Sequence, residues 1–342
     1  MRHIKRHVKL ALALPVLLGL SATQAHAQLV ITPIFDSSIT SDPNAAAIMG
    51  TINSAIGVYE TDFINPINVS ILFKADQGIS LGQSSTYIGN VSYTSYRNAL
   101  ISTKALGTDS TAFESFLTAG AANPVNGGSV VTDTTAGLRA LGFAASPPAG
   151  QADSTISLKT SITNDSRAGV QDPNKYDLFA VASHEINEVL GLGSSLDGLS
   201  NGAAAPSNVG TLDFFRFSGP GIRSFSTAAN ANSYFSVDGG TTSLVHFNQS
   251  QNGDYHDWDN ASQGPGFVPQ VQDAFSTPGT VMNLGTAELT ALTDIGYNRA
   301  PVPAVPEASS SVSLGVLLAL GLGGIALARR RKTARTTANI AS

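Results

Sequence analysis

Residues 177–193, DLFAVASHEINEVLGLG, combine the periodicity of a helix with a cluster of polar side chains. At 100° per residue the apolar side chains gather on one arc, and these are Leu178, Phe179, Ala182, Ile186, Val189 and Leu190. The opposite arc carries His184, Glu185, Asn187 and Glu188. Asp172 and Pro173 upstream are typical of a helix start, and Gly191 is a stop signal. The stretch predicts a half-buried amphipathic helix over residues 172–190.

His184 and Glu188 lie four residues apart, so on a helix their side chains project side by side. With this spacing one helix can offer two ligands to one metal ion. Glu185 lies next to the first of them, where a carboxylate can accept a proton from metal-bound water. The alternative is that these residues form only the solvated face of a surface helix. The apolar flanks favour a half-buried helix, and one of the three histidines in residues 28–302 falls here.

Further ligands have to come from elsewhere in the chain, and residues 253–259, GDYHDWD, are the richest source. By chemistry His256 is the best zinc ligand among them. The carboxylates that remain as alternatives are Asp254, Asp257 and, outside this stretch, Asp213. For Asp213, a pairing with Arg216 or Arg223 is the more typical role. Residues 253–259 also suit an ordinary polar turn or a structural Ca²⁺ loop, since calcium prefers oxygen ligands.

The helix stretch resembles the active-site helix of the metzincin metalloproteases, matrixin-like ones in particular, whose motif is H-E-x-x-H-x-x-G-x-x-H/D. The resemblance implies that His184 is the first zinc ligand, Glu185 the general base and Glu188 the second ligand, with Gly191 at the glycine of the motif. Downstream, TVMNL at 280–284 resembles the Met-turn that lies beneath the zinc in that family, and it precedes an expected short helix.

Two positions depart from the metzincin pattern. The second ligand position holds Glu188 in place of histidine, and the position of the last ligand holds Ser194. Glutamate can bind Zn²⁺ through oxygen at about 2.0–2.2 Å, so the first change alters the site without removing it. Serine is no zinc ligand, so the second change leaves a place that His256 or one of its alternatives has to fill.

Composition excludes several other classes of protein. The chain of 342 residues has no cysteine, which rules out disulfide scaffolds, thiolate zinc fingers, iron–sulfur proteins and cysteine nucleophiles. Four of its 19 basic residues lie in residues 1–27 and five in the last forty, which leaves ten in the body against 23 of the 24 acidic residues. A body with a net charge near −13 offers no basic patch to nucleic acid. No G-x-S-x-G string supports a serine hydrolase.

The N-terminus is typical of a secretory signal peptide over residues 1–27. A basic start, MRHIKRHVK, precedes an apolar run at residues 10–20. Ala25-His26-Ala27 then matches the A-x-A cleavage pattern. We expect the exported chain to begin at Gln28.

The C-terminus carries an expected sorting signal after a short linker at residues 303–310. Residues 311–328 form an uncharged apolar run of 18 residues, long enough for a thin membrane helix, and four basic residues follow it at 329–332. With the Val-Pro-Glu-Ala at 305–308, this order resembles a PEP-CTERM signal of Gram-negative bacteria over roughly residues 304–332. Its membrane helix and Arg cluster take up residues 311–332, and a cytoplasmic tail follows at 333–342. The resemblance implies transient insertion in the inner membrane, an exosortase as sorting partner, and delivery to the cell surface or extracellular matrix. Secreted PEP-CTERM metalloproteases with an HExxE helix are similar.

The remaining pattern of residues 28–302 favours a single α+β domain, and the resemblance makes it a metzincin-like one with a mixed, twisted sheet and an active-site helix. Expected helices lie at 44–60, 93–104, 111–118 and 288–296. Expected strands lie at 68–74 and 154–162, with a hairpin at 234–247.

Three functions follow as hypotheses. The first is an exported zinc-dependent peptidase that acts on a protein or peptide substrate, with Glu185 as general base and zinc on His184, Glu188 and His256. The second is a non-catalytic surface or biofilm-matrix protein on a metalloprotease-like scaffold, which the serine at position 194 favours. The third is a Ca²⁺-stabilised adhesin or glycan-binding module. Metal content separates the three.

Overall fold

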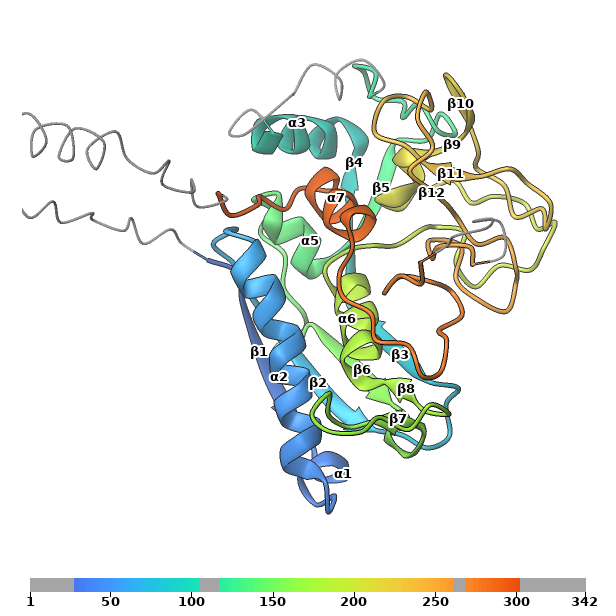
Figure 1. The fold of residues 1–342 in the computed structure, drawn as a ribbon. Helices are drawn as coiled ribbons and strands as arrows, with labels where there is room; N and C mark the ends of the chain where they lie inside the picture. The colour runs from blue at the N-terminus through green and yellow to red at the C-terminus, as the bar shows by residue number, and fades with distance from the viewer. Residues whose placement is uncertain (1–27, 105–116, 261–267, 302–342) are drawn as a thin grey trace, which may run out of the picture. The chain divides into compact units, whose positions relative to one another are not determined.

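The computed structural model describes residues 28–104, 117–260 and 268–301 (Figure 1). By contacts the chain divides into residues 1–299 and 300–342, and the helices and strands below belong to the first unit. The predicted signal peptide, the linker at 303–310, the sorting segment at 311–332 and the tail at 333–342 lie outside the described residues, as does nearly all of the predicted helix at 111–118.

A mixed sheet of four strands organises the first half of the body, with the order β1-β2-β6-β3. Strands β1 (Val30–Phe35), β2 (Asn68–Ala75) and β6 (Ser154–Leu158) are parallel. Strand β3 (Gly82–Thr86) pairs antiparallel with β6 and forms an edge of the sheet. Both strands that the sequence predicts here are present, although β6 ends before a 3₁₀ turn at Thr160–Ile162.

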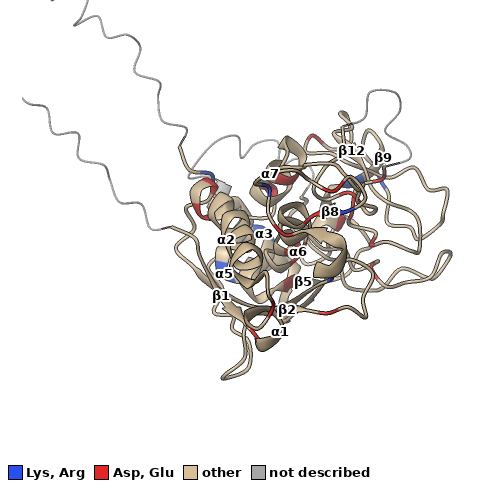
Figure 2. Cartoon of the chain, turned by 60° about the horizontal axis from the view of Figure 1, so that its bottom comes forward, with Lys and Arg blue, Asp and Glu red and all other residues tan. Residues whose placement is uncertain are grey.

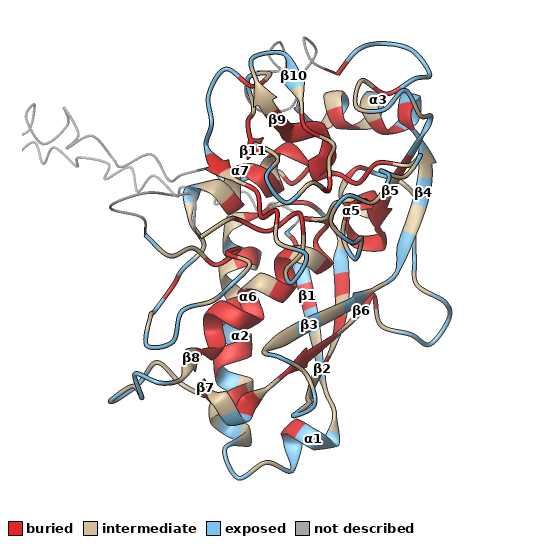
Figure 3. Ribbon diagram, turned by 90° about the vertical axis from the view of Figure 1, so that its right-hand side faces the viewer, coloured by how far each residue is buried: buried red, intermediate tan, exposed pale blue. Residues whose placement is uncertain are grey.

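Two helices, α2 (Ala45–Asp62) and α6 (Leu178–Val189), pack side by side against this sheet (Figures 1 and 3). Alternate residues of β2 supply the buried face, because neighbouring side chains of a strand point to opposite sides. Val69, Ile71 and Phe73 are all fully buried there. The predicted helix at 44–60 is thus confirmed. It lies next to α6 in the helical layer that packs against the sheet.

The start of α6 differs from the sequence prediction. Asp177 is the N-cap, and its side chain accepts a hydrogen bond from the backbone N–H of Phe179 at 3.2 Å. Upstream, Tyr176–Asp177 form the short strand β8, which pairs with β7 (Thr163–Asn164). A helix start at residue 172 is therefore wrong, because this pairing keeps the backbone extended up to the cap.

The polar arc of α6 is also largely withdrawn from solvent, with His184 and Glu188 of intermediate exposure. Glu185 is 5% exposed and Asn187 is fully buried. The interpretation of these residues as a solvated surface face is therefore wrong. Burying such groups is costly unless they find partners, so the elements that cover them determine what the helix does.

The second half of the body has little regular structure. Its sheet is small and antiparallel, with the order β10-β9-β11-β12. Its strands are β9 (Arg216–Gly219), β10 (Ile222–Arg223), β11 (Tyr234–Phe235) and β12 (Val245–His246). Strands β11 and β12 confirm the predicted hairpin. Phe235, Phe247 and Trp258 pack together at ring-centroid distances of 5.3–6.3 Å and form the core here.

The remaining elements surround these two parts. They are α1 (Ser37–Thr40), β4 (Ile88–Ser92), α3 (Tyr93–Lys104), β5 (Val130–Thr134), α5 (Thr135–Ala140), the 3₁₀ turn Leu212–Phe215 and α7 (Thr286–Asp294). Helices α3 and α7 confirm the expectations at 93–104 and 288–296. The predicted α+β class is confirmed, with several small sheets beside the main one. Within the described ranges, no helix has the length and apolar character to cross a bilayer.

Candidate metal centre

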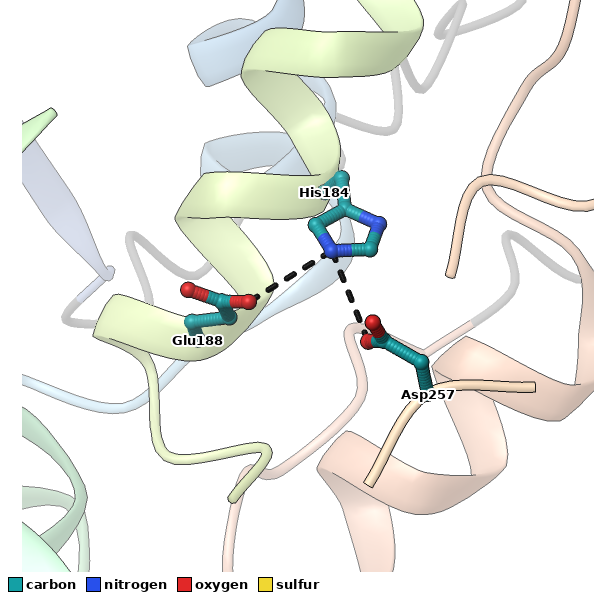
Figure 4. A group of neighbouring side chains, drawn as sticks. All are labelled: His184, Glu188 and Asp257. Carbon is teal, nitrogen blue, oxygen red and sulfur yellow. Dashed lines mark ion pairs between the residues drawn. The ribbon is translucent and has the colours of Figure 1, made fainter. Parts of the chain in front are cut away.

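His184, Glu188 and Asp257 converge at the wall of a cavity, between α6 and the chain that follows the small sheet (Figure 4). Their ligand atoms all lie within 4.8 Å of one another. His184 Nε2 lies 3.4 Å from Glu188 Oε1 and 3.4 Å from Asp257 Oδ1. An imidazole nitrogen and two carboxylate oxygens facing one point form a group that can hold a metal ion.

His256 adjoins the same point from the other side. Its Nε2 lies 3.4 Å from Glu188 Oε1 and 3.3 Å from Asp257 Oδ1. The residue is 4% exposed, and within the described residues this nitrogen has no hydrogen-bond partner. A buried polar atom without a partner needs an explanation, and a ligand shared with the two carboxylates provides one.

The separations are short enough for the side chains to share one ion. Each histidine-to-carboxylate separation is 3.3 or 3.4 Å. The group whose ligand atoms all lie within 4.8 Å of one another is His184, Glu188 and Asp257, and His256 contacts its two carboxylates. Imidazole nitrogens and carboxylate oxygens are ordinary ligands of a small divalent ion, so these residue types fit one.

Each of the two histidines is oriented by its second ring nitrogen. Nδ1 of His184 lies 2.9 Å from the backbone oxygen of Val271, which can only accept a hydrogen bond. Nδ1 of His256 lies 2.8 Å from Asp197 Oδ2. When Nδ1 carries the proton, the lone pair of Nε2 points at the cluster, and such partners are the usual support of metal-binding histidines.

The carboxylates are held from two other directions. Ser84 Oγ on β3 donates to Glu188 Oε2 at 2.6 Å. Gln272 Nε2 donates to Asp257 Oδ1 at 2.7 Å, and its own Oε1 accepts from Asn187 Nδ2 at 2.9 Å. Tyr59 of α2 donates in turn to Asn187 Oδ1 at 2.8 Å. A continuous hydrogen-bonded chain therefore runs from α2 through α6 to the cluster.

The charges of the cluster attract a cation. Burial by itself lowers the pKa of His184, but Asp257 and Glu188 outweigh burial and raise that pKa well above its ordinary value. For His256, too, burial is outweighed by Asp197 and Asp257, and its pKa is raised. Burial raises the pKa of Glu188, but the neighbouring imidazoles of His184 and His256 lower it further than burial raises it. The carboxylates thus favour positive charge at this point, which a divalent ion can supply.

Glu185 lies beside the cluster on the wall of a cavity of about 440 Å³, which His184, Glu188 and Asp257 also line. Its Oε2 is buried without a hydrogen-bond partner in the described residues. Gly82 of β3 approaches it so closely that an added Cβ would lie 2.3 Å from Glu185 Oε1. Burial, followed by the charge of Glu188, raises the pKa of Glu185 well above its ordinary value. The sequence interpretation places Glu185 next to the ligands, and the structure adds the cavity that it faces.

A second cavity of about 370 Å³ adjoins the first. Both are lined by Ser84, Glu188 and Asp254, and the second is also lined by His256. The cluster thus lies where the two cavities meet. Strand β3 lines both of them, with Gly82 in one and Thr86 in the other.

Met282 lies on the wall of the first cavity. It is 4% exposed and packs with Ala180 of α6 and with Val271, whose carbonyl oxygen orients His184. Arg167 joins this segment to the start of α6, because its guanidinium donates to the backbone oxygen of Met282 and to the side chain of Asp177. Sequence reasoning missed Arg167.

Two other predicted positions lie outside the ligand group. Asp213 is fully buried and accepts hydrogen bonds from Ser194 Oγ at 2.5 Å, Ser195 N at 2.9 Å and Gly210 N at 2.7 Å, so it fastens the chain that follows α6. Burial raises the pKa of Asp213 to about 6, although the positive charge of Arg216 acts to lower it. Asp254 lines both cavities, and burial raises its pKa to about 6.

Several residues that support the cluster carry no sequence signal. Tyr59, Ser84, Asp197 and Gln272 come from four distant segments. A lone polar residue in a loop or strand is ordinary by itself, and only the packed chain shows that these side chains meet the ligands. The stretch at 253–259 was found because histidine is rare in the body.

Comparison with protein-family models, with curated proteins and with solved structures finds no match to this chain.

Proposed function

We propose that the chain is an exported zinc-dependent peptidase. The observation that carries the proposal is the spacing of His184, Glu188, His256 and Asp257 at 3.3–3.4 Å beside the buried carboxyl of Glu185. Export rests on the signal-peptide and PEP-CTERM patterns of the two ends. The metzincin resemblance of the helix and the position of Met282 in the same cavity support the proposal.

Zinc is the ion that suits these donors best. Imidazole nitrogens and carboxylate oxygens match zinc, whereas Ca²⁺ takes six to eight oxygens at longer distances. Two carboxylates also balance the charge of one divalent ion. Zinc held by these residues would lower the pKa of a coordinated water toward ~7 and polarise a carbonyl group.

Glu185 has the position of the general base. Its carboxyl lines the cavity next to His184 and has one oxygen free of other hydrogen bonds within the described residues. It accepts the proton of the attacking water and passes it to the leaving amine. Gly82 leaves the room that the carboxyl needs, because any side chain there would overlap it.

The shape of the site favours an extended polypeptide as substrate. Cavities lie on both sides of the ligand cluster, so a chain can enter on one side and leave on the other. Strand β3 borders both cavities and is an edge strand. An edge strand can bind an extended peptide by adding it to the sheet. Cleavage within a chain fits this arrangement better than removal of single terminal residues.

The test is the metal content of the purified full-length chain, with His184→Ala and Glu185→Gln alongside. We expect about one zinc per chain in the wild type, loss of zinc in His184→Ala, and retention in Glu185→Gln together with loss of peptidase activity. A wild-type chain that retains no zinc after incubation with Zn²⁺ would overturn the proposal.

Asp257 favours a second candidate, the non-catalytic surface or matrix protein. With all four side chains bound, the ion would have the closed shell of a structural zinc site, whereas catalytic sites keep one position for water. Cobalt substitution separates the two candidates. A spectrum that changes when a hydroxamate is added indicates an exchangeable position and supports the peptidase, and an unchanged spectrum supports the structural site.

A further inference from the structure

The larger cavity beside the cluster has an acidic wall. Besides the ligands Glu188 and Asp257, it is lined by the carboxylates of Glu185, Asp254 and Asp273, and the described residues that line it include no lysine or arginine. The surplus of acidic over basic residues extends over the whole body (Figure 2). A metal ion would balance the charges of its ligands, which leaves the other carboxylates of this wall uncompensated.

Asp273 is the residue that neither the cluster nor the proposed chemistry uses. It is 3% exposed, and its Oδ2 accepts a hydrogen bond from the backbone N–H of Gln270 at 2.8 Å. Its Oδ1 is buried and has no hydrogen-bond partner among the described residues. Burial raises the pKa of Asp273 to about 7. Leaving a buried carboxylate oxygen without a hydrogen-bond donor is costly. A bound ligand with a donor group would therefore be a suitable partner for Oδ1 of Asp273.

The position of Asp273 is fixed by the core. Trp258, which is fully buried, donates from its backbone N–H to the oxygen of Gln272 at 2.8 Å and accepts from the N–H of Ala274 at 3.0 Å. Asp273 lies between these two hydrogen bonds. Ser276 lines the same cavity, and its Oγ is likewise buried without a partner in the described part of the chain. Two residues with an unpartnered buried oxygen in the described part of the chain therefore line one cavity, and the position of Asp273 is fixed by the core.

We propose that Asp273, with Ser276, makes this cavity a subsite for an organic cation, an ammonium or guanidinium group of the substrate. Because it concerns the substrate, this inference rests on the proposed peptidase function. The enzyme would select polypeptide chains that place a cationic group in the cavity next to the cleaved bond. An ammonium group has three donors and no acceptor, and a guanidinium has five. Either one satisfies both the carboxylate and the hydroxyl and balances the acidic wall. The group comes from a lysine or arginine side chain or from a free amino terminus.

The subsite is tested by binding, without turnover. Calorimetry on the purified full-length chain uses three probes: Nα-acetyl-lysine amide, Nα-acetyl-norleucine amide as its uncharged match, and leucine amide with a free amino group. We expect the lysine probe to bind at least about tenfold more tightly than the norleucine probe. We also expect Asp273→Asn to remove that difference and Ser276→Ala to reduce it. Tighter binding of leucine amide than of the lysine probe would also support a cation subsite, with the amino terminus as the source.

Equal affinities of the charged and uncharged probes for the wild type would overturn the inference, and this comparison needs no variant that has to fold. Undiminished discrimination in Asp273→Asn would also overturn it, provided that the melting curve shows a folded chain. Failure of the proposed function is distinguishable. A chain without zinc that still prefers the lysine probe has the cation subsite and is no zinc peptidase. A chain with zinc and activity but without the preference loses only this inference.

Discussion

The two halves of the body supply the metal cluster in different ways. His184 and Glu188 come from α6, where helical geometry alone puts two side chains next to each other. His256 and Asp257 are consecutive residues in a segment without regular structure. Backbone hydrogen bonds from Tyr255 and His256 to Asp197, together with the packing of Trp258 in the aromatic core, hold them in place.

The part of a site that lies on a helix can be recognised from the sequence, whereas the part on an irregular segment can be located only in the structure. A helix fixes the spacing of its side chains through local geometry, so a pattern of residue types predicts a partial site. An irregular segment is placed by contacts that are distant in sequence, and each of them is specific to one fold. Substitutions in each half can show whether both halves are needed for zinc binding and for activity.

Removing the general base, which lies on α6, should have the largest effect on activity and should leave zinc binding by both halves intact. We expect Glu185→Gln to lower the peptidase rate by about 10²–10⁴-fold, because the amide cannot accept the proton of the attacking water. Zinc content and melting temperature should stay at the wild-type level, since Glu185 is not among the ligand atoms. Activity that survives in Glu185→Gln would exclude this residue as the base.

Removing one ligand from each half tests whether the halves contribute equally. We expect His184→Ala and His256→Ala each to weaken zinc binding more than about 100-fold, beyond the effect of an outer-shell partner. His246→Ala is the matched control, since His246 lies on β12 outside the cluster. Zinc affinity is measured by competition with a chelator. If His256→Ala keeps its affinity for zinc while His184→Ala loses it, Asp257 is the single zinc ligand that the irregular half contributes.

What the sequence could predict follows the same division. The helix at 177–193, its pair of ligands and the base could be predicted from spacing, as could the strands β2 and β6 with their alternating residues. The helix start was misplaced because Asp172-Pro173 has the form of a cap, whereas the pairing of β8 with β7 decides the outcome. The pairing involves only two residues on each strand, too few for any periodicity to reveal.

The other half of the site could be predicted only as a set of alternatives. Chemistry ranked His256 first and kept Asp257 as a substitute, whereas the structure brings both to the cluster. No spacing rule places residues 256 and 257 opposite residue 184, because the intervening chain is irregular. The third alternative, Asp213, proved to be an anchor of the chain after α6, a role that requires the positions of Ser194 and Gly210.

The support of His256 should matter less than the ligand itself. We expect Asp197→Asn to weaken zinc binding about 10- to 100-fold, because the neutral amide no longer favours the ring orientation and proton position that expose Nε2. Asp238→Asn provides a control, as the Asp238 carboxylate accepts hydrogen bonds from Ser236 and Thr242 of its own turn and from no other segment among the described residues. Equal affinities in the Asp197 variant and the wild type would mean that backbone contacts alone hold the irregular half.

A smaller effect is expected where β3 meets α6. In Gly82→Ala the new Cβ would lie 2.3 Å from Glu185 Oε1 and 2.9 Å from Val181 Cγ1, so the flexible carboxyl has to move. We expect activity to fall about tenfold, with zinc content unchanged, because misplacing a catalytic group lowers the rate without removing the metal. Gly57→Ala in α2, where an added Cβ meets nothing within 4 Å, should leave activity intact. Loss of zinc in Gly82→Ala would contradict this division of roles.

The pH dependence of the metal-free chain should give the smallest effect and involves both halves at once. The carboxylates outweigh burial and raise the pKa of His184 and of His256. A histidine with a raised pKa in the folded state stabilises the fold fully below its unfolded pKa of about 6.5, and this contribution is lost as the pH rises through the folded pKa. The melting temperature of the metal-free wild type, relative to His184→Ala, should therefore fall as the pH rises above about 6.5.

Zinc reverses the trend, because it needs the histidines deprotonated and binds better as the pH rises. We expect the stabilisation by added Zn²⁺ to grow over the pH range in which the metal-free chain loses its advantage over His184→Ala. Calorimetric melting in chelator and in Zn²⁺ at a series of pH values measures both. The His256→Ala variant should lose the pH dependence of the melting temperature to the same extent as His184→Ala, since each histidine contacts the same two carboxylates. A pH response that vanishes in only one of the two variants would show that the halves titrate separately, and that the cluster is no single electrostatic unit.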